Sequence, residues 1–170
     1  MKNLTPVSLR VNGEQYDLLI HPWRTLLEVL RENLSLTGAK RSCQEGQCGA
    51  CTVLIDRKPV NSCLFLAVEA QGKDILTIEG VANHGSGLHP LQKSFVEKGA
   101  VQCGFCSPGM ILAGIALLDE NPNPSEEEVR QAIVGHLCRC TGYVPIVKAI
   151  LDAAQEMNAA VPELAGEVRS

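Results

Sequence analysis

The first eighty residues alternate apolar and polar positions in short segments, which is the pattern of half-buried β-strands. Residues 7–20 hold two such segments on either side of Asn12-Gly13, and this dipeptide is a strong signal for a two-residue hairpin turn. Apolar residues recur at helical spacing after Thr25, which stands three positions before Glu28 as in a capping box. The pattern therefore predicts a β-hairpin followed by a short helix packed on it.

Two more strands are predicted further along the same stretch, over residues 52–55 and 75–78, where β-branched and aliphatic side chains are frequent. Residues 56–59, Asp-Arg-Lys-Pro, predict a turn after the first of them. Strands with one crossing helix are typical of a small β-grasp type of domain, to which we assign residues 1–80.

The second half of the chain differs in kind, because its apolar residues recur at helical spacing. Residues 80–87 lose periodicity and gain glycine, which predicts a linker between two domains. Ser125 and Glu128 form a second capping-box pair. We expect a four-helix bundle over 81–158 and a tail without pattern over 159–170. The helices are predicted over residues 91–98, 110–120, 125–137 and 144–157. The fold class is therefore α+β.

Composition and charge exclude several classes of protein. Hydrophobic residues make up 45% of the 170 residues, enough for a sizeable core, but no apolar run approaches the roughly 18 to 20 residues of a membrane span. The N-terminal residues lack the apolar region of a signal peptide, so we expect a cytoplasmic protein. The net charge is −4, and residues 1–80 hold nine charges of each sign, so no basic surface for nucleic acid is expected.

Eight cysteines indicate metal sites rather than disulfides. They make up about 5% of the chain, below the roughly 8 to 10% of a disulfide scaffold, and a chain of this length does not need covalent staples. They fall into two sets of four, separated by a cysteine-free stretch of about forty residues. The first set is Cys43, Cys48, Cys51 and Cys63, and the second set is Cys103, Cys106, Cys138 and Cys140. Each set can supply the four thiolate ligands of one metal site, so the sequence indicates two such sites.

The first set has the spacing C-x4-C-x2-C followed by a distal cysteine, which is the plant-type pattern of a [2Fe–2S] cluster. Gly46 and Gly49 allow its loop to adopt backbone conformations that most residues disfavour. The second set places its cysteines near the ends of predicted helices, whose N-termini favour thiolates. Zinc is the alternative for both sets, because each contains a C-x2-C knuckle, but the x4 gap and the C-x-C pair fit zinc poorly.

Three motifs carry a resemblance to a known family. GQCGACTV at 46–53, QCGFCSPGM at 102–110 and LCRCTGY at 137–143 resemble the signatures of the iron–sulfur subunit of molybdenum hydroxylases, the xanthine dehydrogenase family. The resemblance covers roughly residues 7–155. It implies an N-terminal ferredoxin-like β-grasp domain and a C-terminal four-helix domain, each of which binds one [2Fe–2S] cluster.

The resemblance also implies a division of tasks among subunits. A large partner subunit would hold the molybdenum–pterin cofactor and a further subunit would hold FAD, in a dimer of heterotrimers. Gln102 and Cys140 would contact the pterin, although Gln102 has an alternative interpretation as a loop residue that satisfies backbone groups. This chain would hold no catalytic residue. It would pass single electrons from the molybdenum site to the helical-domain cluster, then to the plant-type cluster, and then to flavin or another acceptor.

Two positions depart from the family pattern, which more often has threonine and asparagine where this chain has Ser107 and His136. We expect the Ser107 hydroxyl to cap the following helix. We expect His136 to be a solvent-facing or hydrogen-bonded residue of a helix, with a proton-transfer role beside the cluster as the alternative.

The substrate of the complex is expected to be a purine or another N-heterocycle, because residues 43–48 and 99–103 look most like small subunits of bacterial purine and nicotinate-type dehydrogenases. Aldehydes, carbon monoxide and aromatic acyl-CoA are the alternatives. A free-standing two-cluster ferredoxin is the alternative of a different class. The balanced charge of residues 1–80 speaks against it, since it gives a diffusing carrier no patch for electrostatic steering.

Overall fold

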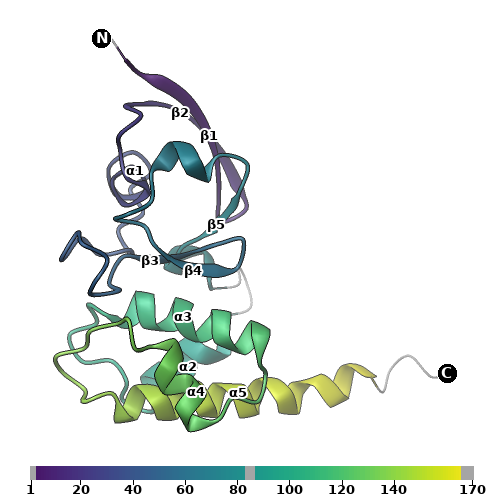
Figure 1. The fold of residues 1–170 in the computed structure, drawn as a ribbon. Coiled ribbons are helices and arrows are strands. Elements are labelled where there is room, and N and C mark those ends of the chain that lie inside the picture. The colour runs from purple at the N-terminus through teal and green to yellow at the C-terminus, as the bar shows by residue number, and fades with distance from the viewer. Residues whose placement is uncertain (1–2, 83–86, 166–170) are drawn as a thin grey trace.

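The computed structural model describes residues 3–82 and 87–165, and it shows a mixed α+β protein in which a five-stranded sheet lies beside a group of helices (Figure 1). The predicted α+β class is confirmed. Residues 83–86 of the predicted linker and residues 166–170 of the predicted tail lie outside the described residues.

The sheet contains the predicted hairpin. Asn12 and Gly13 adopt positive φ angles of 54° and 86°, as a tight hairpin turn between two strands requires. The first strand of the hairpin pairs in parallel with the last strand of the sheet, and the other pairings are antiparallel. The strands are β1 (Thr5–Val11), β2 (Glu14–Ile20), β3 (Thr52–Ile55), β4 (Lys58–Asn61) and β5 (Asp74–Leu76), in the order β2-β1-β5-β3-β4.

Strand β4 corrects the predicted turn over residues 56–59. Asp56 and Arg57 alone form the turn, with φ angles of 49° and 68°. Pro59 already belongs to the strand and pairs with Leu54 of β3. Proline removes one ladder donor, but β4 lies at the edge of the sheet, where that loss is tolerated.

Helix α1 (Leu26–Glu32) begins at the predicted capping box. The Thr25 hydroxyl accepts a hydrogen bond from the Glu28 N–H at 3.3 Å, and the Glu28 carboxylate accepts one from the Thr25 N–H at 2.9 Å. Leu26 and Leu30 of this helix are fully buried in the same hydrophobic cluster as Leu9 of β1. This packing fixes α1 and thereby the start of the first cysteine loop, which follows the helix.

The remaining α-helices are α2 (Pro90–Glu97), α3 (Ser107–Glu120), α4 (Glu126–Ala132) and α5 (Val144–Ala165). α3 lies between the sheet and the other helices (Figure 1), and Leu54 of β3 belongs to the hydrophobic cluster of the helices. An ion pair of 2.5 Å between Arg57 and Asp119 joins the turn before β4 to α3. The capping box of Ser125 and Glu128 at the start of α4 is confirmed. The two halves of the chain are therefore packed together through α3.

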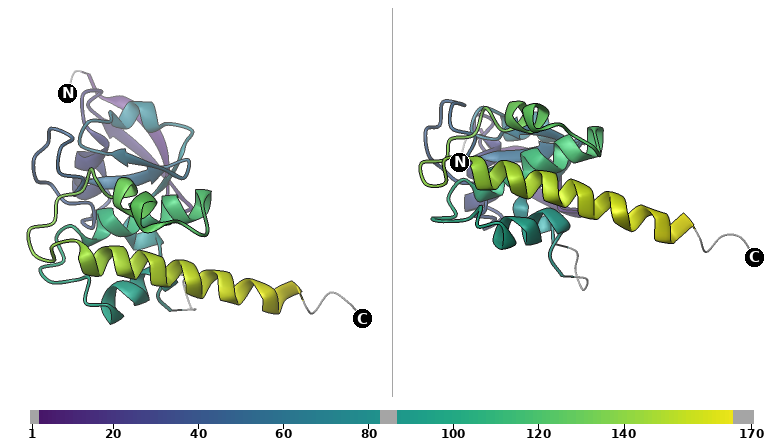
Figure 2. Two further views of the ribbon diagram at one scale, coloured as in Figure 1. Left: turned by 60° about the horizontal axis from the view of Figure 1, so that its bottom comes forward. Right: turned by 90° about the horizontal axis from the view of Figure 1, so that it is seen from below.

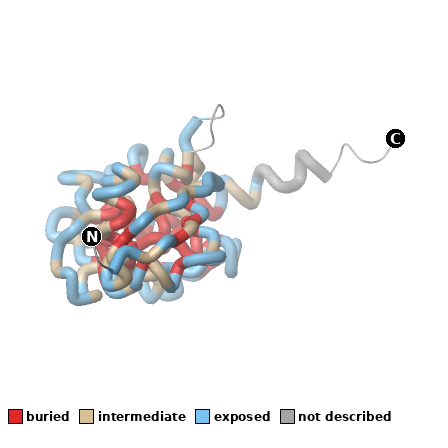
Figure 3. Tube along the Cα trace, turned by 90° about the horizontal axis from the view of Figure 1, so that it is seen from above, coloured by how far each residue is buried: buried red, intermediate tan, exposed pale blue. Residues whose placement is uncertain are grey.

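Two helices end elsewhere than predicted. α4 ends at Ala132 instead of 137, so that His136 and Leu137 lie in a loop. α5 continues to Ala165, beyond the predicted end at 157, and extends away from the body of the molecule (Figure 2). Buried residues gather in the interior while many loop residues are exposed (Figure 3). Among residues 3–82 and 87–165, no helix combines the length and apolar character that crossing a membrane requires.

Candidate metal centres

The first cysteine set lies on the loop between α1 and β3 and directly after β4. The loop turns through left-handed backbone conformations at Gln44, Gly46 and Gly49, with φ angles of 60°, 74° and 67°. Asn61, the last residue of β4, donates from its side-chain amide to the Gly46 carbonyl at 3.0 Å. The end of β4 therefore holds the loop in place and positions Cys63 beside it.

The thiols of the first set lie close enough to perturb one another. The Cys48 side chain contributes to the lowered pKa of Cys43, and the Cys63 side chain to the raised pKa of Cys51. The backbone N–H of Glu45 donates to the Cys43 sulfur at 3.4 Å and, as the main cause, lowers the pKa of Cys43 to about 6. Burial raises the pKa of Cys51 to about 11. Cys43 is therefore mostly thiolate at neutral pH, whereas metal binding must displace a proton from Cys51.

The second cysteine set lies on two loops of the helical half. Cys103 and Cys106 directly precede α3, and Cys138 and Cys140 lie between α4 and α5. The Tyr143 hydroxyl closes the latter loop, because it accepts from the Cys138 N–H at 2.9 Å and donates to the carbonyl of His136 at 3.1 Å. The start of α5 thus positions the last two cysteines.

The thiols of the second set lie close enough to perturb one another across the two loops. The side chain of Cys138 affects the pKa of Cys106, and that of Cys103 affects the pKa of Cys140. Burial raises the pKa of Cys106 to about 12, and the hydrogen bond with Cys103 raises the pKa of Cys140. Burial also opposes ionisation of Cys138, but hydrogen bonds led by that of the Thr141 hydroxyl, 3.2 Å from its sulfur, outweigh this effect and lower its pKa.

The donor chemistry of each set fits a [2Fe–2S] cluster. All eight cysteines are free thiols, and the pairwise contacts lie within each set of four. A cluster of two irons is held by four thiolates from one set, two on each iron. In the described part of the chain, no three His, Cys, Asp or Glu side chains surround a position for a single metal ion.

The two cysteine loops touch each other, which sequence reasoning did not foresee. The N–H of Leu137 donates to the carbonyl of Cys48 at 3.0 Å. The side chain of His136 is buried, and its Nε2 lies 3.0 Å from the hydroxyl of Thr52, the residue after Cys51. Burial lowers the pKa of His136. His136 is therefore an interior loop residue and not the helical residue that was predicted.

Three further predictions concern Ser107, Gln102 and Cys140. The Ser107 prediction is wrong, because Cys106 is the N-cap of α3 and no side chain caps this helix. Gln102 is exposed beside the exposed Cys103 and is thus accessible to a partner. Cys140 is exposed as well. Contact of Gln102 and Cys140 with a pterin stays a prediction.

Gly49 lies where the two loops meet, and its replacement by alanine should loosen this junction. A Cβ at Gly49 would lie 2.6 Å from both the Gly135 carbonyl oxygen and the His136 ring, on a backbone with φ +67°. The left-handed conformation alone costs a non-glycine residue about 1–3 kcal/mol, and the clash adds to it. Thermal unfolding should show Gly49→Ala to be more destabilised than Gly72→Ala, whose φ is +77° but whose Cβ would meet nothing within 4 Å. Equal losses in the two variants would contradict the contact.

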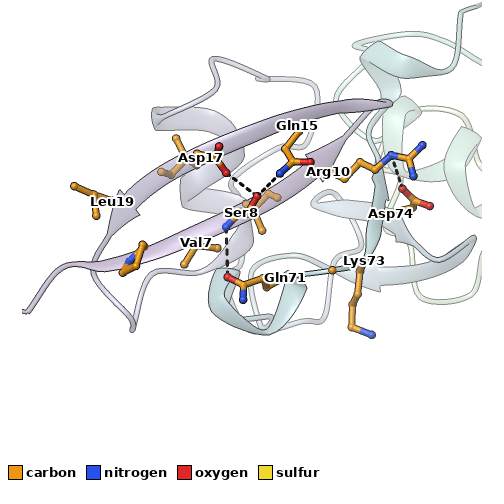
Figure 4. Close-up of a pocket in the computed structure, with 13 residues that line it drawn as sticks. Val7, Ser8, Arg10, Gln15, Asp17, Leu19, Gln71, Lys73 and Asp74 are labelled. Carbon is orange, nitrogen blue, oxygen red and sulfur yellow. Dashed lines mark hydrogen bonds and ion pairs between the residues drawn. The ribbon is translucent and has the colours of Figure 1, made fainter.

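A groove of about 680 Å³ on the outer face of β1 and β2 lies apart from the cysteines (Figure 4). Its polar side chains pair with one another: Ser8 donates to Asp17 and accepts from Gln15, both at 2.7 Å. Arg10 and Asp74 form an ion pair of 3.1 Å at one end. Because these groups satisfy each other, we assign the groove no role.

Comparison with known proteins agrees with this arrangement. Residues 9–77 match the family described as 2Fe-2S iron-sulfur cluster binding domain, and residues 77–151 match the [2Fe-2S] binding domain. The chain is 48% identical to the nicotinate dehydrogenase small FeS subunit of Eubacterium barkeri, over 90% of this chain and 97% of that subunit. It is also 48% identical to the aldehyde oxidoreductase of Megalodesulfovibrio gigas, over 91% of this chain but 17% of that longer protein.

A solved structure has a similar fold. The fold is similar to that in the crystal structure of quinoline 2-oxidoreductase from Pseudomonas putida 86, with a TM-score of 0.88 and 44% identity. The match covers 93% of this chain and 98% of the chain in that crystal structure. With two cluster-binding domains and near-complete coverage of a small FeS subunit, this chain belongs to the small iron–sulfur subunits of the molybdenum hydroxylases, the xanthine dehydrogenase family.

Proposed function

We propose that this chain is the electron-transfer subunit of a molybdenum hydroxylase and that each set of four cysteines holds one [2Fe–2S] cluster. The observation that carries the proposal is the convergence of the thiols within each set. One-electron relay is the chemistry that such clusters supply, because four thiolates leave no iron position open to a substrate. The free thiols suit a reducing compartment, and we propose the cytoplasm.

We assign the plant-type cluster to a ferredoxin-like β-grasp domain over 1–80 and the other cluster to a four-helix bundle over 81–158, followed by a C-terminal segment over 159–170. Two separate hydrophobic clusters support this division. One contains the apolar faces of β1 and α1, and the other contains those of the helices after residue 90. Each domain thus has a core that can position its own cysteines.

Exposed apolar side chains beside the second set support a large partner subunit that holds the molybdenum–pterin cofactor. Val134 and Leu137 are 75% and 62% exposed on the loop that leads to Cys138, and Phe105, next to Cys106, is 44% exposed. Apolar surface of this kind marks interaction sites. Because Cys103, Cys140 and Gln102 are also exposed, we place the molybdenum cofactor on this side, with Gln102 and Cys140 in contact with its pterin.

Exposed apolar side chains in the first half of the chain support a second partner. Leu64, which directly follows Cys63, is 62% exposed, and Trp23 is 61% exposed. We propose that a flavin subunit, or another acceptor, docks there and that the complex is a dimer of heterotrimers. The chain accordingly relays electrons from the helical side to the ferredoxin-like side.

We propose a purine or another N-heterocycle as the substrate of the complex. Nicotinate and quinoline, named for two of the similar proteins, are N-heterocycles. An aldehyde is the second candidate, because the aldehyde oxidoreductase matches with the same 48% identity as the nicotinate enzyme subunit. Carbon monoxide and aromatic acyl-CoA have no such support among these proteins.

The test is to purify the native complex through this chain and to measure its iron, molybdenum, pterin and flavin. We expect all four, with dye reduction driven by xanthine or nicotinate and no turnover by the isolated chain. Inactivity toward both heterocycles, with activity toward an aldehyde or carbon monoxide, would remove the first substrate candidate. A stable native monomer that carries both clusters would instead support a free ferredoxin, and zinc at two per chain would contradict the relay.

A further inference from the structure

We propose that His136 is a positioning residue which, together with Thr52, fixes the two cysteine loops against each other. Electron transfer between the two cluster sites then depends on this imidazole. The inference rests on the proposed relay. It concerns a residue that neither the thiol contacts nor the pterin contact involves.

The His136 side chain fills the junction of three segments and is only 7% exposed. Its ring packs against Gly49 on the first cysteine loop, because a Cβ there would lie 2.6 Å from ring atom Cδ2. It also packs against Gly109 in the first turn of α3, where a Cβ would lie 3.2 Å from the same atom. Glycine at both positions leaves the space that the ring occupies, so the ring cannot shift without opening the junction.

The hydrogen-bond network assigns the direction of the contact with Thr52. The Thr52 hydroxyl donates to the Gly49 carbonyl at 2.8 Å, and its single hydrogen is thereby used. Its oxygen therefore accepts from Nε2–H of His136 at 3.0 Å. This bond links the segment that carries Cys138 to the residue that follows Cys51.

A second hydrogen bond between the loops lies next to the first: the N–H of Leu137 donates to the Cys48 carbonyl at 3.0 Å. One hydrogen bond between two loops allows them to rotate about it. Two hydrogen bonds from consecutive residues, together with the packing of the ring, fix the position of one cysteine loop relative to the other. Because electron tunnelling weakens steeply with distance, this placement governs how quickly an electron passes from one site to the other.

The length of the side chain gives a sharp test. A glutamine amide nitrogen reaches about as far from Cα as Nε2 of histidine, whereas the side chain of alanine ends at Cβ. His136→Gln should therefore keep the bond to Thr52, and His136→Ala should lose it. Thr52→Val removes the same bond from the other partner and leaves the histidine in place. Ser94→Ala removes a hydroxyl that is equally buried but bonds Asp152 at 3.0 Å within the helical half.

The experiment uses the complete complex with its clusters. After chemical reduction with dithionite, electron paramagnetic resonance measures the line splitting caused by the magnetic interaction of the two reduced clusters, which depends on their separation. Rapid mixing with substrate then measures the rate at which the plant-type cluster is reduced. We expect His136→Ala and Thr52→Val to lower the splitting and, because tunnelling weakens steeply with distance, to slow this rate about tenfold, which corresponds to about 1.4 kcal/mol in the barrier.

His136→Gln and Ser94→Ala should behave like the unmodified protein. Unchanged splitting and rate in both His136→Ala and Thr52→Val would overturn the proposal, as would an equal loss in His136→Gln and His136→Ala. If His136→Ala fails to retain its clusters, Thr52→Val decides. Failure of this proposal can be distinguished from failure of the proposed function. The splitting after reduction with dithionite needs neither substrate nor turnover, so it tests the placement of the loops alone. If the proposed function is wrong, no substrate will reduce the clusters of the unmodified complex.

Discussion

Replacing Cys138 with alanine will abolish one of the two paramagnetic signals of the reduced protein, and replacing Cys48 with alanine will abolish the other. The reason is that the thiol contacts stay within each set: Cys138 pairs with Cys106, and Cys48 pairs with Cys43. Each domain also has its own hydrophobic cluster. Losing one ligand should therefore cost one cluster and leave the other bound. Electron paramagnetic resonance together with iron analysis will show a fall from two clusters to one.

The matched control is Glu45→Ala on the same loop as Cys48. The Glu45 side chain is exposed, and only its backbone N–H contacts a cysteine, at 3.4 Å from the Cys43 sulfur. This variant should keep both signals. A single signal in the unmodified protein, or loss of both signals from either cysteine variant, would show that the sets do not bind separate clusters.

Local signals predicted much of the fold because each acts over a few residues. Asn12-Gly13 determines a hairpin through the φ angles that its turn requires, and Thr25 with Glu28 determines a helix start through their mutual hydrogen bonds. The turn over 56–59 was predicted too long because proline usually ends a strand, and the sequence does not reveal that β4 is an edge strand.

The wrong end of α4 has a different cause. Val134 and Leu137 continue the helical spacing of apolar residues, which predicted a helix to 137, but they are 75% and 62% exposed. Their apolar character therefore does not serve the core of this chain, and we connect it with the partner surface. A pattern of apolar residues cannot by itself distinguish these two uses.

The residues of the candidate site also differ in how far the sequence could predict them. The two sets of cysteines could be proposed as ligands from the sequence because their spacing is typical of iron–sulfur sites. The contact of His136 with Thr52 joins residues 84 positions apart, and it depends on how α3 and the sheet pack. A threonine or a histidine does not by its type indicate which residue it contacts. The only sequence feature that could have pointed to this contact was the position of each residue beside a cysteine, since Thr52 follows Cys51 and His136 stands two residues before Cys138.

The order in which the two clusters pass electrons leads to the second prediction with a large expected effect. Cys48→Ser should abolish electron delivery to flavin while substrate still reduces the helical-domain cluster, because we propose that the first set lies on the acceptor side. Cys138→Ser should stop reduction of both the plant-type cluster and the acceptor. The hydrogen bond from Leu137 to Cys48 supports a relay in series, because it brings the loops that carry the two sites together. Rapid-mixing spectroscopy separates the two half-reactions. Reduction of the plant-type cluster at the normal rate in Cys138→Ser would overturn the order.

A matched pair of glutamines tests which end faces molybdenum without removing a cluster. Gln102 precedes Cys103 as Gln47 precedes Cys48, and both side chains are exposed. Gln102→Ala should slow reduction by substrate up to about tenfold, because a lost hydrogen bond costs about 0.5–1.5 kcal/mol and 1.4 kcal/mol corresponds to a factor of ten. Gln47→Ala should leave that step unchanged. Both variants should keep their iron. If Gln47→Ala slowed reduction by substrate and Gln102→Ala did not, the plant-type cluster would be the one that faces molybdenum.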